Sequence, residues 1–397
     1  MNSVKYKSNL WKLSWVLVAR NFLLSMPIIT IFFQSRGLSL TEIMILQVVF
    51  SVAVVILEVP SGYLADLFKR KTLLSWGALF ATIGYVSYAL AYDFWSILWA
   101  ELALAISASF ISGSDSALLY ESLLAIRKEK SYAKWQGRIF AFTRVSESVA
   151  ALLGGFLTVV SITAPFWFQV PFLASAFFVS LFIVEPPRQQ KRLKANPFKE
   201  MWQLTVYALH KQQKLKWLIM TYALLSTSSI IFVWLAQPYF KQIGVPILYF
   251  GLIWAALNML SAISSSMAYK VEKLFGLRKT MILLMLMPIV AYVGVAVFDS
   301  SLLGLVFVPL FWLLWGFQET VLKDYAQQQI ESSVRATLLS VKSFAARASF
   351  SILAPLAGLL ADYKSLTWTF WASVAFLLVT LSWSVFKLVS VYESRKE

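Results

Sequence analysis

Long apolar segments alternate with short polar turns along the whole chain of 397 residues. Each segment runs for about 20 residues, the length that a helix needs to cross the ~30 Å hydrocarbon core of a bilayer. Apolar and polar residues do not alternate within the segments as they would in a barrel strand, so we expect helices, whose backbone groups bond within one segment. The pattern predicts twelve transmembrane helices, placed near 11–34, 42–66, 73–91, 95–121, 137–161, 165–184, 217–241, 247–269, 280–298, 302–325, 337–361 and 367–391.

Composition supports the same interpretation. Hydrophobic residues make up 59% of the chain and charged residues 14%, with a mean hydropathy of +0.71, which lies outside the range of soluble domains. The first apolar segment is kept as a span and not taken as a cleaved signal, because apolar segments continue to the end of the chain. There is no Cys, which excludes disulfide and thiolate chemistry. The sequence predicts an all-α integral membrane protein with no cofactor and no metal.

The cations predict the orientation in the membrane. Most of the 35 Lys and Arg residues, Lys342 among them, fall in one alternate set of loops, and the opposite loops hold only Arg36, Lys241 and Lys364. Because Lys and Arg stay on the cytoplasmic side during insertion, we expect both termini in the cytoplasm. The net charge of +16 then forms a collar that faces anionic membrane lipids, so it needs no nucleic-acid partner. A chain without a sizeable outer domain fits a multi-pass protein of a bacterial inner (cytoplasmic) membrane.

A polar stretch divides the chain into two similar halves. Residues 185–216 are rich in cations and separate an N-terminal six-helix bundle, 1–184, from a C-terminal six-helix bundle, 217–397. The halves repeat residues at one constant spacing: Gly113 with Gly316, Glu121 with Asp324, Arg144 with Arg347, and Gly155 with Gly358. Parallel six-helix repeats place a binding cavity at their interface, so we expect two pseudo-symmetric bundles around a central cavity.

The stretch EVPSGYLADLFKRKT, 58–72, concentrates charge at the cytoplasmic end of the second span. The pattern resembles the G-x-L-a-D-R-x-G-R-K signature of the major facilitator superfamily, matched at Gly62, Leu64, Ala65, Asp66, Arg70 and Lys71. It departs from the signature at Leu67, where the family has Arg, and at Lys69, where the family has Gly. The resemblance implies the two-bundle fold of that family and a cytoplasmic latch in which Asp66 is held against the second half in the outward-facing state. The alternative is that the cations only anchor the turn in the membrane.

Charged residues inside the spans are candidate functional groups, since each costs about 3 kcal/mol to insert unless it faces a cavity or a partner. We expect Asp115 to meet Arg144 and Glu319 to meet Arg347, and Glu101 to reach water near the outer end of its span. Either a proton pathway or static ion pairs would account for these groups. The predicted substrate and proton pathway comprises Arg20, Glu58, Asp115, Arg144, Glu147, Gln318, Glu319 and Arg347, with Glu58 and Glu147 in the titrating role.

These features favour a secondary active transporter that moves a small molecule by alternating access, coupled to protons and working as a monomer. The compact layout favours efflux, although Gly154 and Gly155 lack the proline found in the corresponding signature of drug antiporters. Uptake by symport is an alternative. A membrane-embedded enzyme or lipid-handling protein lacks support, because the spans hold no His base, no phosphate loop and no metal-spaced cluster. A passive channel or receptor fits the duplicated plan poorly.

Overall fold

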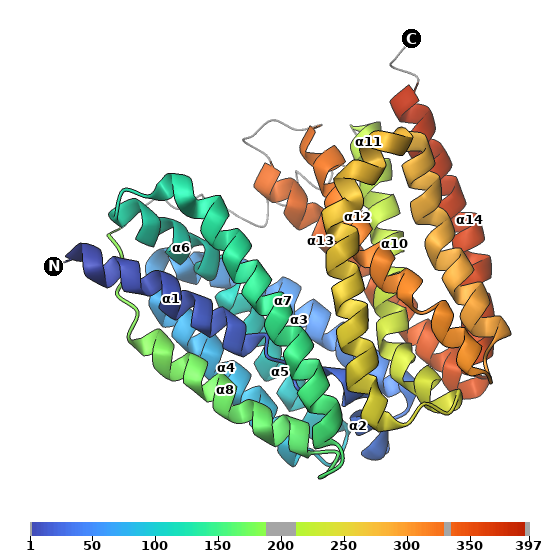
Figure 1. The fold of residues 1–397 in the computed structure, drawn as a ribbon, viewed down its shortest axis with the longest axis horizontal. Coiled ribbons are helices and arrows are strands. Elements are labelled where there is room, and N and C mark those ends of the chain that lie inside the picture. The colour runs from blue at the N-terminus through green and yellow to red at the C-terminus, as the bar shows by residue number, and fades with distance from the viewer. Residues whose placement is uncertain (1, 188–211, 329–334, 394–397) are drawn as a thin grey trace. The chain divides into compact units, whose positions relative to one another are not determined.

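The structure is a computed structural model that describes residues 2–187, 212–328 and 335–393. Within these ranges, the side chains at 2–4, 59–67, 323–324, 326–328 and 335–340 are not described. All regular elements of the described part are helical (Figure 1). They are α1 Asn2–Arg20, η1 Met26–Ile28, α2 Ile29–Ser35, α3 Leu40–Leu67, α4 Arg70–Leu90, α5 Phe94–Ile111, α6 Ser114–Ala125, η2 Glu129–Ser131, α7 Tyr132–Leu157, α8 Ala164–Leu181, α10 Gln213–Gln242, η4 Ile247–Tyr249, α11 Phe250–Val297, η5 Leu302–Val306, α12 Pro309–Gln328, α13 Arg335–Tyr363 and α14 Leu366–Glu393.

Among the described residues, 10 helical stretches are long and apolar enough to cross a membrane, and Met26–Ser35 is a shorter apolar helix. One of the 10, Ile247–Val297, contains two of the predicted spans. Gly276 separates them with a φ of 72°, a left-handed conformation that glycine adopts without strain. The α11 ribbon turns back on itself between its two ends (Figure 1). The chain is therefore an all-helical, multi-pass membrane protein, as the sequence predicts.

Two predicted helices are broken in the structure. The span expected over 11–34 ends as α1 at Arg20 and resumes only at η1, where Pro27 lies in the first turn, a position at which its missing N–H needs no helical partner. The span expected over 95–121 is interrupted at Gly113, whose φ of 76° ends the helical conformation before α6 begins. The continuous helices predicted at these two places are wrong, and both breaks leave charged residues at helix ends.

The chain forms two compact units. Unit 1 comprises Met1–Leu38, Val49–Ala195 and Ile247–Ala255; unit 2 comprises Ser39–Val48, Asn196–Pro246 and Ala256–Glu397. The start of α3 therefore groups with unit 2, and the start of α11 groups with unit 1. The division into sequential bundles at 1–184 and 217–397 stays a prediction, and most of the predicted linker, 188–211, lies outside the described residues.

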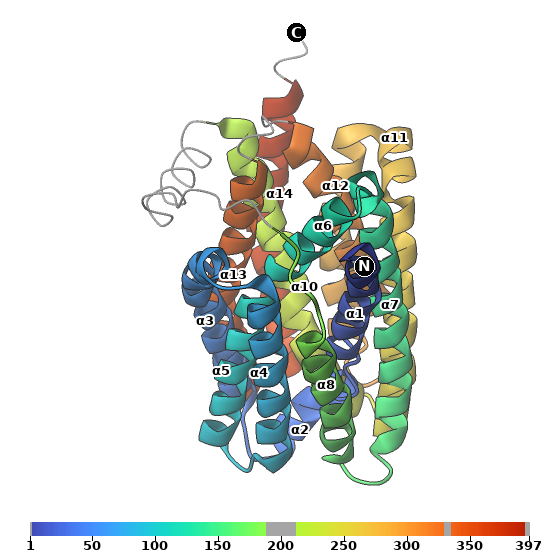
Figure 2. The ribbon, with the colours of Figure 1, turned by 90° about the vertical axis from the view of Figure 1, so that its left-hand side faces the viewer.

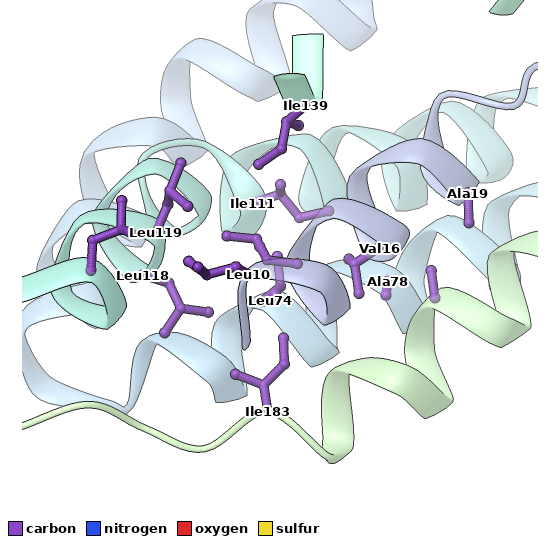
Figure 3. Close-up of a cluster of buried hydrophobic side chains, with 13 residues drawn as sticks. Leu10, Val16, Ala19, Leu74, Ala78, Ile111, Leu118, Leu119, Ile139 and Ile183 are labelled. Carbon is purple, nitrogen blue, oxygen red and sulfur yellow. The ribbon is translucent and has the colours of Figure 1, made fainter. Parts of the chain in front are cut away.

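Unit 1 is held together by helix packing around α4, which lies between α5 and α8 (Figure 2). Gly77 and Gly84 allow the close approach of α5, since a Cβ at either position would overlap Ile111 or Leu104. A cluster of buried aliphatic side chains joins α1, α4, α5, α6 and α7 (Figure 3). In water, burial of this kind would contribute about 25 cal/mol per Å2 of apolar surface. In lipid, close packing supplies most of the stabilisation.

Unit 2 is built around α10, which packs against α12, α13 and α14. Aromatic rings fill its centre: Phe232 stacks on Phe311 with ring centroids 3.8 Å apart, and Tyr292 meets Phe311 edge-on. The buried hydroxyl of Tyr292 donates a hydrogen bond of 2.8 Å to the carbonyl oxygen of Ser228 on α10. The rings and this bond fix the rotation of α10, which carries one residue of the polar cluster described below.

Candidate functional site

A polar cluster in unit 1 lies where its two broken spans end. Arg20 is the last residue of α1, and Asp115 lies in the first turn of α6. The two side chains interact electrostatically, and the Asp115 carboxylate accepts a hydrogen bond of 2.6 Å from the backbone N–H of Ser116. An acidic side chain in the first turn also offsets the positive end of the helix. The breaks thus bring together a cation and an anion that sequence reasoning placed in the same pathway.

The predicted pairing of Asp115 with Arg144 is wrong. Arg144 pairs with Glu147 one turn along α7, with 2.7 Å between Nη1 and Oε2. The left-handed residue Gly113 redirects the chain just before Asp115, so depth counted along one continuous helix gives the wrong partner. Side-chain exposure is 48% for Arg144 and 16% for Glu147, so this pair lies partly at the surface of the described unit.

Neutral polar groups that the sequence prediction missed extend the unit 1 cluster. The backbone N–H of Ser25 donates a long hydrogen bond of 3.4 Å to the Oε1 atom of Gln169, and the hydroxyl of Tyr85 lies beside both side chains. Gln169 is fully buried, and within the described part of the chain its Nε2 donates no hydrogen bond. A glutamine in the apolar segment 165–184 was the available signal. We name Arg20, Ser25, Tyr85, Asp115 and Gln169 the unit 1 cluster.

Glu101 does not reach water, contrary to expectation. The residue is 3% exposed, and its side chain interacts with Tyr88 on α4. Glu58 behaves differently, because it is exposed on α3 in the described structure.

A second polar cluster lies in unit 2 and includes a residue that the sequence analysis placed elsewhere. The Lys342 Nζ atom on α13 lies 2.9 Å from the Oε2 atom of Glu319 on α12. The hydroxyl of Tyr222 on α10 donates a hydrogen bond of 3.3 Å to Glu319 Oε1, and Lys342 Nζ lies 3.8 Å from the centre of the Tyr222 ring. We name Tyr222, Glu319 and Lys342 the unit 2 triad.

The triad corrects two expectations. Glu319 pairs with Lys342 and not with Arg347, and Lys342, counted among the membrane-anchoring cations, is 4% exposed. Lys342 lies 7 residues after the start of α13, so the sequence pattern indicates a cation in the adjacent loop. In the structure, neighbouring helices cover its side chain. Arg347 is half-buried and acts electrostatically on Tyr222. Gln318, beside Glu319, is 2% exposed, and its Oε1 accepts no hydrogen bond from the described residues.

The signature turn between α3 and α4 is held within unit 1. The Arg70 Nε atom lies 3.0 Å from Glu121, and the Glu185 carboxylate accepts hydrogen bonds of 2.8 Å and 3.0 Å from the backbone N–H groups of Arg70 and Lys71. Glu185 therefore caps the N-terminus of α4, a role that sequence reasoning missed. Gly62 and Asp66 belong to α3, but their side chains lie outside the described part.

An apolar pocket of about 200 Å3 lies among α10, α11, α13 and α14 of unit 2. Its walls are mainly Leu, Ile, Ala and Phe side chains, and the hydroxyl-bearing residues in its lining are Thr227, Ser228, Tyr292, Thr369 and Ser373. No member of the unit 2 triad lines it. The pocket and the triad are therefore separate features of unit 2.

Comparisons with known proteins agree with this architecture. Residues 14–322 match the family model described as Major Facilitator Superfamily. The chain is 20% identical over 166 residues to the quinolone resistance protein NorA of Staphylococcus aureus, a match that spans 42% of each chain. It is 28% identical over 151 residues to the class E tetracycline resistance protein of Escherichia coli, covering 38% of this chain and 34% of that relative. A solved mutant of the nucleoside transporter NupG superposes with a TM-score of 0.80 at 12% identity, covering 96% of this chain and 99% of that one.

Proposed function

Since the chain belongs to the Major Facilitator Superfamily and is a membrane-embedded transporter of small molecules, we propose that it exports its substrate by proton-coupled alternating access. The observation that carries the proposal is the presence of paired ionisable groups inside the spans of both units: Arg20 with Asp115, and Glu319 with the buried Lys342. Such groups are expensive in a membrane and persist where they serve an ion or substrate path.

In this proposal the carboxylates carry the coupling. A carboxylate that faces a cation stays charged, whereas one that faces a dry environment takes up a proton. Rearrangement of the helices would move a carboxylate between these surroundings and so link proton binding to the open side of the transporter. The groups assigned to the pathway are Arg20, Glu58, Asp115, Arg144, Glu147, Gln318, Glu319 and Arg347, to which we add Lys342 and Tyr222.

The latch on the cytoplasmic side is assigned to Gly62, Asp66, Arg70 and Lys71. Its support is the ordered turn after α3, where Glu121 holds the Arg70 side chain and Glu185 holds two backbone N–H groups. A turn fixed in this way can position the end of α3 as a rigid element. We further propose that the protein works as a monomer in a bacterial inner membrane with both termini in the cytoplasm, in keeping with the positive-inside pattern of its loops.

Export is supported by the names of two relatives, a quinolone resistance protein and a tetracycline resistance protein, which each match less than half of the chain. Their names identify two compound classes to test. The proposal for this chain is export of a small organic molecule.

The test uses purified protein in proteoliposomes with an imposed pH gradient. A fluorescent quinolone or tetracycline should accumulate on the acidic side, and a protonophore should abolish the accumulation. Asp115→Asn serves as the coupling variant. Leu124→Ala, at an exposed position of the same helix, serves as its control. Accumulation that survives the protonophore would overturn proton coupling. Movement only toward the alkaline side would overturn export and favour uptake by symport.

A further inference from the structure

The unit 2 triad has the chemistry of a binding site for a carboxylate. It contains the ammonium group of Lys342, whose side chain is 5% exposed. It also contains the hydroxyl group of Tyr222, a residue that is 8% exposed. Both donors point at one carboxylate, with Nζ 2.9 Å from Oε2 and the hydroxyl 3.3 Å from Oε1. A charged donor and a neutral donor that converge on the two oxygens of one carboxylate form a geometrically specific receptor.

The two partners of the ion pair differ in their freedom to leave. Lys342 is enclosed by the protein and lies against the face of the Tyr222 ring, at 3.8 Å from its centre. The Glu319 side chain has an exposure of 46%. A buried ammonium is costly without an anion, whereas a half-exposed carboxylate regains hydration when it turns away. Glu319 is therefore the partner that can be exchanged, and Lys342 with Tyr222 forms the fixed part.

We propose that Lys342 and Tyr222 form the receptor for a carboxylate group of the transported molecule, and that the Glu319 carboxylate fills this receptor when no substrate is bound. The inference rests on the proposed transport function and is independent of its direction. A substrate carboxylate would take the hydrogen bonds of Lys342 Nζ and the Tyr222 hydroxyl, and Glu319 would rotate toward its exposed side. No covalent bond changes in this exchange.

The surrounding charges favour an anion over a cation. Arg347, on the same helix as Lys342, contributes positive potential at Tyr222. Among the side chains that the structure describes, the charged and titratable groups at the site include Lys342 and Arg347 from α13, Glu319 from α12 and Tyr222 from α10. A cationic substrate that binds Glu319 would have to break its ion pair with Lys342, which would leave the buried ammonium without an anion. The site therefore predicts carboxylic acids or zwitterions as substrates.

The first test supplies the carboxylate from solution. In the Glu319→Gln variant the receptor loses its own carboxylate, so sodium benzoate should raise the melting temperature of the purified full chain by about 3 °C at tenfold its dissociation constant. Benzamide, which has the same shape and no charge, and sodium chloride at equal ionic strength should not. The matched control is Glu319→Gln combined with Lys342→Met, which removes both partners and should show no benzoate effect.

Equal shifts with benzoate and benzamide, or an undiminished benzoate shift in the double variant, would overturn the receptor. If Glu319→Gln is not recovered folded, Glu319→Asp gives the same comparison, because the shorter acid withdraws from Lys342 by one methylene. This measurement involves no transport, so its outcome is separate from that of the proposed function.

The second test concerns the substrate. Quinolone carboxylic acids and other aromatic acids are compared with their methyl esters in the proteoliposome assay. We expect wild type to transport the acid at least tenfold faster than the ester, and Lys342→Met to remove that preference. Equal transport of acid and ester by wild type would overturn the substrate assignment while leaving transport itself established. A failure of all vectorial transport would instead contradict the proposed function.

Discussion

Asp362, near the end of α13, caps the N-terminus of α3 within unit 2. Its Oδ1 atom accepts a hydrogen bond of 3.0 Å from the backbone N–H of Leu40, and its Oδ2 atom accepts bonds of 2.7 Å and 2.6 Å from the N–H and the hydroxyl of Thr41. Gly358, one turn earlier on α13, allows this approach, because a Cβ there would meet the backbone of Thr41 at 2.7 Å. We predict that Asp362→Ala destabilises unit 2.

The magnitude follows from the lost bonds. Replacing an N-cap side chain by Ala costs about 1 kcal/mol and up to about 2 kcal/mol. The charged Asp362 side chain accepts hydrogen bonds from two backbone N–H groups and one hydroxyl, so we place its contribution at the upper end of this range of free energies. Thr41 is partly exposed, so water replaces some of the lost hydrogen bonds. We expect a loss of about 2 kcal/mol, equivalent to a fall in melting temperature of about 4–8 °C.

The assay is thermal unfolding of the purified full chain, followed by tryptophan fluorescence. Asp362→Asn keeps an acceptor oxygen and should lose less than half as much as Asp362→Ala. Thr41→Val removes only the hydroxyl bond, and its effect should largely disappear in the Asp362→Ala background, because both changes delete the same interaction. A melting temperature of Asp362→Ala within 1 °C of wild type, or additive effects of the two changes, would refute the reasoning.

Three further predictions concern unit 1. Gly154→Ala should destabilise the fold by about 1–3 kcal/mol, since the added Cβ would overlap the carbonyl oxygen of Leu24. Gly137→Ala, on the same helix, places its Cβ in open space and should be neutral or stabilising, and thermal unfolding distinguishes the two variants. Hydrogen bonds from the first turn of α5 lower the pKa of Asp93. The stability that these bonds contribute is therefore present above the unfolded-state pKa of about 3.9 and is lost as the pH falls through the lower folded-state pKa. The difference in melting temperature between wild type and Asp93→Asn should shrink over that acidic range. Glu185→Ala should lower stability by about 1–2 kcal/mol by exposing the N-terminus of α4, and hydrogen exchange should show that first turn opening; unchanged protection there would contradict the cap.

The helical, multi-pass architecture follows from the sequence because the bilayer imposes one simple length. A segment of about 20 apolar residues has to span it, and the backbone has to bond internally, so hydropathy alone locates the helices. The turn at Gly276 between the eighth and ninth predicted spans was recognisable in the same way. The signature around Asp66 and Arg70 likewise identified the family before any geometry was considered, because its residues are close in sequence.

Partners of the charged residues were harder to predict. The depth of a residue along a helix identifies possible neighbours only while the helix continues. Because the chain breaks at Gly113 and before Pro27, Asp115 interacts with Arg20 and not with the predicted partner Arg144. An interrupted span has almost the same hydropathy as a continuous one, so the pattern of apolar residues carries little information about the break.

Sequence by itself determined that this chain is a helical membrane protein of the Major Facilitator Superfamily, and which rare charged residues its spans contain. Only the tertiary structure decided which of these groups meet, that Lys342 is buried against Tyr222 and Glu319, and that Asp362 caps a helix far away in the chain. The physical reason is that transfer into a bilayer depends on the composition of each segment separately, whereas ion pairs and caps depend on the rotation and breaks of helices that are set by packing against other segments.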